Sequence, residues 1–200
     1  MLETLVYLEL VKVLTFGFNS GNTELMSRIL TYNASSADNQ QERIPKNIDN
    51  LKYYLAGFVD GEGSFSVTIC KSKFAKLGWK VDPLFQVYQH KDNSKILHVF
   101  KDAFECGYVS EKGGNPSCHV YCVDSIRDLL GKVIPFFDKY PLVGEKYDNF
   151  LLFKEIVIRI SLKEHLNSSG LIGLAKIAFK MNRLGKYRHN SLEDIINSLE

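Results

Sequence analysis

The segment from Leu55 to Ser64, with the sequence LAGFVDGEGS, restricts the possible folds of this chain more than any other. Within a helix, Gly57 and Gly61 would lie about one turn apart, so one side of that helix would carry almost no side-chain atoms. A glycine inside a helix costs about 0.5–1 kcal/mol relative to alanine, which predicts an offsetting gain. A bare side lets a second backbone approach closely, and we therefore expect a tight helix–helix contact here.

Two carboxylates, Asp60 and Glu62, follow the bare side at the expected C-terminal end of this helix. The helix dipole is negative at that end, so acidic side chains are unfavourably placed there. Carboxylate and backbone carbonyl oxygens are the ligands that hard divalent cations prefer. The pair therefore indicates a cation site. The alternative is a glycine-terminated helix whose acids simply face water.

Hydrophobic periodicity around this segment predicts an α+β domain. Strand-like alternation is clearest after Ser64, where Phe65, Val67 and Ile69 alternate with small polar residues. The expected order is α-β-β-α-β-β-α with extra C-terminal helices: helix 49–61, strands 64–73 and 80–89, helix 94–105, strands 107–111 and 118–123 around a turn at 113–116, and helices 124–137, 146–166, 168–183 and 191–199. Two antiparallel hairpins with helices on one face leave the other face of the sheet open.

The first 46 residues are expected to form a separate N-terminal extension. Apolar residues recur at helical spacing within 5–14 and 25–30, which predicts two short helices. Residues 33–46 are polar and contain a proline, as is typical of a linker. We therefore place the main domain at residues 47–200.

Composition excludes several classes of protein. Of the 200 residues, 45% are hydrophobic and 24% are charged, which fits a globular chain with a sizeable core. No uncharged apolar run approaches the roughly 20 residues that a membrane helix needs, so we expect no membrane partner. The four cysteines lack C-x-x-C spacing, and the five histidines do not occur at zinc-ligand spacing. We expect free thiols in a reducing compartment, and histidines with structural or surface roles.

The net charge of +2 is small but unevenly distributed along the chain. Residues 1–62 contain five Lys or Arg and eight Asp or Glu, whereas residues 63–200 contain twenty and fifteen. Residues 63–81 contain four lysines and no acid. Such a run fits phosphate contacts and fits a solvated loop equally well.

The segment LAGFVDGEGSF resembles the signature of the LAGLIDADG homing endonucleases. The similarity extends over residues 47–182 in the same order of elements, with further matches at 85–89, 107–109, 134–142 and 146–150. The signature occurs once, because the similar segment at 170–175 lacks the acids. The resemblance therefore implies the single-motif branch, in which two chains form a C2 homodimer.

The same resemblance implies an intron-encoded, site-specific endonuclease that hydrolyses both DNA strands at a long pseudo-palindromic site. It implies Mg2+ as the cofactor, with Ca2+ or Mn2+ able to substitute in a crystal, held by Glu62 and the carbonyl of Gly61. Glu62 stands where the family more commonly has aspartate. The implied catalytic residues are Glu62, Gln89, which matches a water-orienting glutamine, and Lys146, with Lys139 as a second candidate for the lysine.

In the family, the bare helix side forms the dimer interface. The residues that this implies for the interface here are Leu55, Gly57, Phe58, Asp60 and Gly61. Among them, Asp60 is expected to be structural, tying the helix end in place. Each helix would then present Glu62 beside its twin, near the scissile phosphates of opposite strands.

Duplex DNA is expected on the open face of the sheet, because alternate side chains of paired strands can reach base edges in the major groove. Lys71, Lys73 and Lys76 are expected in the turn between the first two strands, where they would contact phosphates. The full set of expected DNA-binding residues is Ser66, Thr68, Cys70, Lys71, Ser72, Lys73, Lys76, Lys80, Asp82, Gln86, Tyr88, Ser110 and Lys112.

The main alternative is an RNA-binding maturase, which assists intron splicing on the same scaffold. Retention of Glu62 favours cleavage without excluding both roles. A dinucleotide-binding enzyme does not fit, because the glycines do not form G-x-G-x-x-G and the helix precedes the strand. The resemblance also implies an organelle-encoded protein of a mitochondrion or chloroplast, and the lack of a recognisable targeting peptide agrees with synthesis in place.

Overall fold

The computed structural model describes residue 27 and residues 47–181 and 190–199 of the chain. Apart from residue 27, the expected N-terminal helices and the linker lie outside the described residues. The end of the helix expected at 168–183 also lies outside them. The domain boundary expected at residue 47 therefore stays a prediction.

Helix α3 (Ile48–Glu62) carries the glycine-containing segment, as predicted. It begins after Asn47, whose side-chain oxygen accepts a hydrogen bond from the backbone N–H of Asp49 at 2.9 Å. Such a cap satisfies an N–H group that has no partner within the helix. Leu55 and Val59 are fully buried, so this side of α3 packs on the core and the glycines lie on the other side.

The predicted strands form one antiparallel sheet in the order β1-β2-β4-β3. In the register, Phe65 pairs with Phe85, and Phe85 pairs with Val123. The last hairpin turns at Gly113 and Gly114 alone, so its second strand begins earlier than predicted. The four strands are β1 (Gly63–Lys71), β2 (Trp79–His90), β3 (Tyr108–Lys112) and β4 (Asn115–Val123).

The remaining helices confirm the predicted order with some changes at their ends. They are the short η2 (Lys91–Asn93), α4 (Lys95–Phe104), α5 (Ile126–Asp128), the π-helical η3 (Leu129–Val133), α6 (Ile134–Lys139), α7 (Lys146–Ser161), the short η4 (Glu164–Leu166), α8 (Ser168–Ala178) and α9 (Leu192–Asn197). The single helix expected at 146–166 is interrupted, because Lys163 has a left-handed backbone with φ of 62°. Among the described helices, none has both the length and the apolar character needed to cross a membrane.

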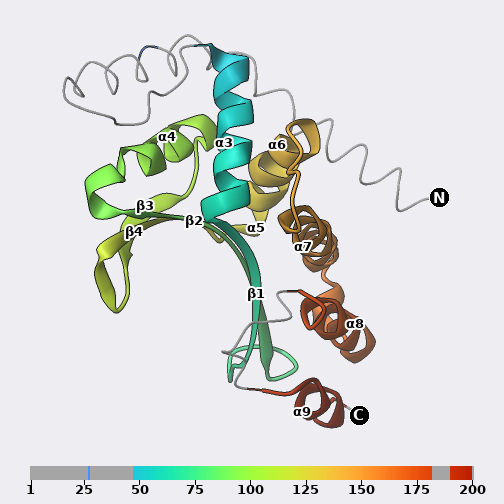
Figure 1. Cartoon of the computed structure of the whole chain (residues 1–200). Coiled ribbons are helices and arrows are strands. Elements are labelled where there is room, and N and C mark those ends of the chain that lie inside the picture. Colours follow the sequence, from blue (N-terminus) through green and yellow to red (C-terminus); the bar gives the residue numbers. More distant parts are fainter. Residues whose placement is uncertain (1–26, 28–46, 182–189, 200) are drawn as a thin grey trace.

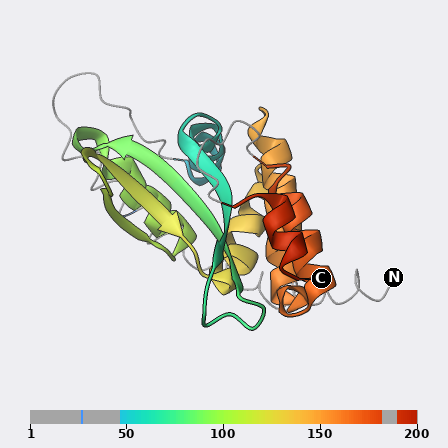
Figure 2. The ribbon, with the colours of Figure 1, turned by 90° about the horizontal axis from the view of Figure 1, so that it is seen from below.

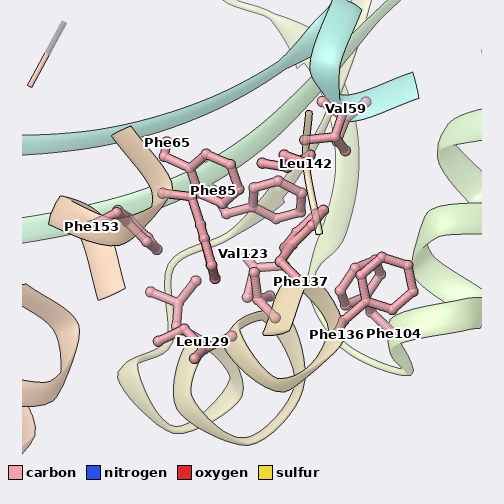
Figure 3. Packing of buried hydrophobic residues seen from close by; sticks show 14 of the residues in the cluster. Val59, Phe65, Phe85, Phe104, Val123, Leu129, Phe136, Phe137, Leu142 and Phe153 are labelled. Carbon is pink, nitrogen blue, oxygen red and sulfur yellow. The ribbon is translucent and has the colours of Figure 1, made fainter. Parts of the chain in front are cut away.

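The helices α3, α4, α6 and α7 lie on the same side of the curved sheet (Figure 1). Between them and the sheet lies the main core, in which aromatic rings predominate (Figure 3). The rings of Phe65 and Phe85 stack with centroids 5.1 Å apart, and both contact Phe137. Phe136, Phe137, Phe150 and Phe153 are all buried, which confirms their predicted place in the core. This packing holds α3 and α7 against the start of β1.

A second, smaller core lies at the far end of the β1–β2 hairpin. Its buried members are Trp79 on β2, Leu171 and Ala175 on α8, and Ile195 on α9. The turn between β1 and β2 projects beyond the rest of the sheet (Figure 2). The C-terminal helices therefore support a part of the hairpin that the main core does not reach.

Candidate cleavage site and nucleic-acid interface

One side of α3 is open along its length. A Cβ atom added to Gly57 or Gly61 would meet no atom within 4 Å. Tyr53, one turn before Gly57, is 61% exposed and belongs to the same stripe, although the sequence analysis missed it. The spacing of positions 53, 57 and 61 could have revealed it, because residues four apart lie on one helix face.

Two of the expected interface residues point away from this stripe. Leu55 is fully buried in the chain's own core, so its expected place in a dimer interface is wrong. The physical reason is the helical rotation of about 100° per residue, which turns Leu55 about 200° away from Gly57. Phe58 is half-buried, and its ring centroid lies 5.8 Å from that of Phe100.

The carboxylate of Asp60 is used within the chain. It accepts hydrogen bonds from the backbone N–H groups of Val143 (2.9 Å) and Gly144 (3.4 Å), which precede α7. An acid that is unfavourably placed at the end of one helix thus satisfies amides near the start of another, where negative charge is favourable. This contact agrees with the structural role expected for Asp60.

Lys146, in the first turn of α7, reaches the same helix end. Its ammonium donates hydrogen bonds to the carbonyl oxygens of Gly63 (2.7 Å) and Gly61 (3.3 Å). Burial lowers the pKa of Lys146, and the charges of Asp60 and Glu62 partly oppose that shift. The structure therefore brings Lys146 to the end of α3. The ammonium of Lys139, the second candidate, lies over the Tyr140 ring, 5.5 Å from its centroid.

Glu62 and Gln89 flank this lysine. Glu62 is the exposed last residue of α3. The sheet register pairs Gly63 with Val87, so Gln89, two residues further along β2, lies beside the end of α3. The side-chain oxygen of Gln89 accepts a hydrogen bond from the backbone N–H of His90 at 2.7 Å. An acid, a lysine and an amide therefore meet where α3 passes into β1.

The donor chemistry at this helix end suits a hard cation. The Glu62 carboxylate and the Gly61 carbonyl are oxygen donors of the kind that Mg2+ prefers. Asp60 is less suited, because both of its oxygens already accept backbone amides. Within the described ranges, no three His, Cys, Asp or Glu side chains come together to hold a metal ion. One chain therefore offers only part of a coordination shell.

The sheet face opposite the helices carries most of the expected DNA-binding residues. Strand alternation and register place Thr68 opposite Asp82, and Cys70 opposite Lys80, on this face. The Lys80 ammonium donates to the Asp82 carboxylate at 2.9 Å, and this contact raises the pKa of Lys80. The strand residues brought together on this open face are Ser66, Thr68, Cys70, Lys80, Asp82, Gln86, Tyr88 and Ser110.

A connected group of side chains lies on this face between β2, β4 and β3. The Tyr88 hydroxyl donates to the Gln86 side-chain oxygen at 2.8 Å, and the Gln86 amide nitrogen contacts the Cys122 sulfur at 3.5 Å. The Lys112 ammonium lies 4.7 Å from the centroid of the Tyr88 ring, which brings Lys112 to the same face. The sequence analysis missed Cys122 and the exposed Tyr108, because the pairing partner of β4 could not be known from local alternation.

The turn between β1 and β2 is held by its own backbone hydrogen bonds, including Ser72 N–H to Gly78 O at 2.8 Å. Lys73 and Lys76 are exposed in this turn, as expected. Lys71 is not in the turn: it ends β1, and its ammonium lies 5.6 Å from the Trp79 ring centroid. Because Trp79 packs on the C-terminal helices, Lys71 lies on the helix-covered face, and its expected position is corrected.

Comparison with known proteins gives the family of this chain. The family model described as LAGLIDADG endonuclease matches residues 55–157. The chain is 31% identical over 150 residues to the homing endonuclease I-ApeII of Aeropyrum pernix, and the match covers 73% of this chain and 88% of that protein. The chain therefore belongs to the LAGLIDADG endonuclease family.

Solved structures agree with this assignment. An archaeal intron-encoded homing endonuclease, I-Vdi141I, solved in complex with DNA, matches with a TM-score of 0.71 and 32% identity, over 76% of this chain and 96% of the other. A probable intron-encoded endonuclease 2 of Neurospora crassa is 35% identical over 118 residues, or 59% of this chain. The chain spans only 24% of the length of that Neurospora relative.

Proposed function

We propose that this chain is a site-specific DNA endonuclease that hydrolyses phosphodiesters and works as a homodimer. The observation that carries the proposal is the meeting of Glu62, Lys146 and the Gly61 carbonyl at the end of the open side of α3. That end is also where the open face of the sheet begins, so a duplex on the sheet would run past these groups. Family membership and the DNA-bound relative support the same function.

The proposed roles follow from the chemistry of each group. Glu62 and the Gly61 carbonyl would hold Mg2+, which when bound lowers the pKa of water and stabilises charge on the phosphate and the leaving oxygen. Lys146 would place a positive charge beside the scissile phosphate. Gln89 would orient water through its amide. Asp60 would act indirectly, by holding the segment that precedes Lys146.

A homodimer is proposed because one chain has one such site and a duplex has two strands to cut. The stripe of Tyr53, Gly57 and Gly61 would pack against the same stripe of a second chain. A C2 axis there would bring the two Glu62 residues close to each other, facing opposite strands. The preferred DNA site would then be close to palindromic.

The length of the sheet predicts a long DNA site. Strand β2 has 12 residues. At about 3.4 Å per residue it spans roughly 40 Å, or about 11 base pairs at about 3.4 Å each. Two half-sites would therefore cover roughly 20 base pairs. We propose DNA contact for the open-face residues named above, for Lys112, and for Ser72, Lys73 and Lys76 of the turn; Lys71 faces the helices and is not among them.

The maturase alternative is not favoured, because the named relatives are endonucleases and this chain keeps its acid at position 62. We also propose that the chain is encoded by an organellar intron. Relatives named as intron-encoded endonucleases support this origin.

The test is cleavage of a pooled library of intron-free organellar genes in Mg2+, with the cut ends mapped by sequencing. Wild-type protein is expected to cut at one or a few sites, and EDTA is expected to abolish cutting. Glu62→Gln should reduce cutting at least about 100-fold while retaining binding in a gel-shift assay, since it removes a charge at the reacting centre. Glu155→Gln, which changes an exposed acid of α7, should cut normally. Wild-type cutting by Glu62→Gln would overturn the proposed catalytic role.

A further inference from the structure

The outer part of the β1–β2 hairpin has little support from the rest of the sheet. Strand β4 pairs with β2 only from Phe85 to His90. In the described part of the chain, residues 79–84 of β2 therefore pair with β1 alone. An isolated two-stranded ribbon is marginally stable in water, so this outer ribbon needs packing from elsewhere.

That packing comes from Trp79 and the C-terminal helices. Trp79 is 5% exposed and contacts the buried Ile195 of α9 within the second core. Its indole N–H donates to the Ser198 hydroxyl at 2.8 Å, and that hydroxyl donates to the Ile195 carbonyl at 2.8 Å. The Lys71 ammonium lies on the Trp79 ring, so the contact combines apolar burial, a hydrogen bond and a cation–π interaction.

Helix α9 depends on this contact in turn. It has six residues, and a helix of that length is not stable in water without tertiary packing. A capping box between Ser191 and Asp194 begins it, and Lys71 contributes to lowering the pKa of Asp194. The ribbon and α9 therefore stabilise each other across 119 residues of sequence.

The ribbon's direction decides where its turn meets a duplex. From residue 84 to residue 79 the ribbon extends by about 17 Å at roughly 3.4 Å per residue. A tilt of about 10° would displace its end by about 3 Å, close to one base-pair step of about 3.4 Å. A small loss of packing at Trp79 would therefore shift Lys80, Asp82 and the turn by nearly one base pair relative to Glu62.

We propose that α9 is a positioning element for DNA recognition: by packing on Trp79, it keeps the outer ribbon in register with the cleavage centre. This inference rests on the proposed function and adds that discrimination at the outer base pairs of each half-site depends on Trp79, Ile195 and Ser198. These three residues are positioning residues, because their side chains act through the ribbon and not on DNA.

The test is a cleavage profile on single base-pair variants of the site recovered from the pooled library. Ser198→Ala and Ile195→Ala should each lower discrimination at the outer base pairs by at least about fivefold, which is small beside the cost of about 1–3 kcal/mol for a mismatched pair. Discrimination at the inner base pairs and the single-turnover rate on the preferred site should stay within about twofold. Ser198→Thr, which keeps the hydroxyl, should restore the outer discrimination.

The matched control is Ser161→Ala, which removes a similar serine-to-carbonyl hydrogen bond at the end of α7. All variants are compared below their unfolding temperature, where circular dichroism gives the same folded signal. A loss of discrimination spread evenly over all positions, or no change at all, would overturn the positioning role while leaving the endonuclease proposal intact. If the wild type cuts no member of the pool, the endonuclease proposal fails and the positioning role fails with it.

Discussion

The carboxylate of Asp60, at the end of α3, accepts the backbone N–H of Val143 at 2.9 Å, 83 residues later in the chain. The next amide, that of Gly144, reaches the other carboxylate oxygen. Two residues further on, Lys146 returns to α3 and donates to the Gly61 and Gly63 carbonyls. Asp60 therefore ties the start of α7 to the end of α3, and the lysine is held between these two attachments.

Replacing Asp60 should loosen this connection. Asp60→Ala is expected to lower the free energy of unfolding by about 1 kcal/mol, as for the loss of a helix-capping side chain. Cleavage should fall more than DNA binding does, because Lys146 loses its fixed position. Asp60→Asn keeps one acceptor oxygen and should recover part of both effects. Urea denaturation and single-turnover cleavage measure them, and an Asp60→Ala protein that cuts as fast as the wild type would contradict the coupling.

Gly57 separates monomer stability from dimerisation. A Cβ at position 57 meets no atom within 4 Å in the single chain. Gly57→Ala should therefore stabilise the monomer by about 0.5–1 kcal/mol through helix propensity. If the bare stripe is the dimer interface, the same methyl group should weaken self-association, as sedimentation equilibrium would measure.

The control for Gly57 is Gly170, where an added Cβ would overlap the Glu164 carbonyl oxygen. Gly170→Ala should destabilise the chain and leave the association constant of the folded protein unchanged. Equal self-association by Gly57→Ala and the wild type would exclude this stripe as the interface.

The exposed lysines of the β1–β2 turn should contribute to DNA binding through phosphates. Lys73→Ala and Lys76→Ala should each reduce the slope of log affinity against log salt by about 0.9, the value for one phosphate contact. The loss should be similar for all DNA sequences, because phosphate contacts carry no base information. Lys101→Ala, on the exposed side of α4, is the matched control and should leave the slope unchanged. Fluorescence anisotropy titrations over a salt series would decide between these outcomes.

Two cysteines should resist alkylation in the folded protein. Burial raises the pKa of the Cys106 thiol and of the Cys122 thiol, because a thiolate is poorly solvated there. Their reaction with iodoacetamide should accelerate only at a pH above the ordinary thiol range, whereas in urea they should react as ordinary thiols. Peptide mass spectrometry over a pH series measures both profiles.

The same shifts fix the sign of a stability change. As pH rises through the ordinary thiol range, unfolded thiols lose protons that the folded chain still keeps. The free energy of unfolding should therefore fall with rising pH in that range. Cys106→Ala together with Cys122→Ala should flatten the dependence, and an unchanged slope would show that these thiols do not cause it.

Much of the fold could be predicted because its signals are local. Alternation around Phe65 and Phe85 correctly assigned the inner face of the first hairpin, and the glycine spacing correctly predicted a bare side of α3. The break at Lys163 could not be predicted, because a left-handed residue other than glycine has no reliable sequence signal. The metal, the dimer and the individual DNA contacts stay predictions.

The candidate site was predicted in part. Glu62 is exposed at the helix end as expected, and Lys146 reaches the same place. The choice between Lys146 and Lys139 needed the structure, since both lie near the start of α7 in sequence. The error at Leu55 had a simpler cause: the signature segment was treated as one surface, although a helix turns successive residues to different sides.

The sequence by itself determined the order of the elements, the inner and outer faces of the strands and the family, because periodicity and a contiguous signature are carried by neighbouring residues. Only the tertiary structure decided which groups far apart in the chain meet: Asp60 with Val143, Lys146 with Gly63, and Trp79 with Ser198. These contacts join residues 83 to 119 positions apart. They depend on how the whole core packs, and local pattern carries no record of that packing.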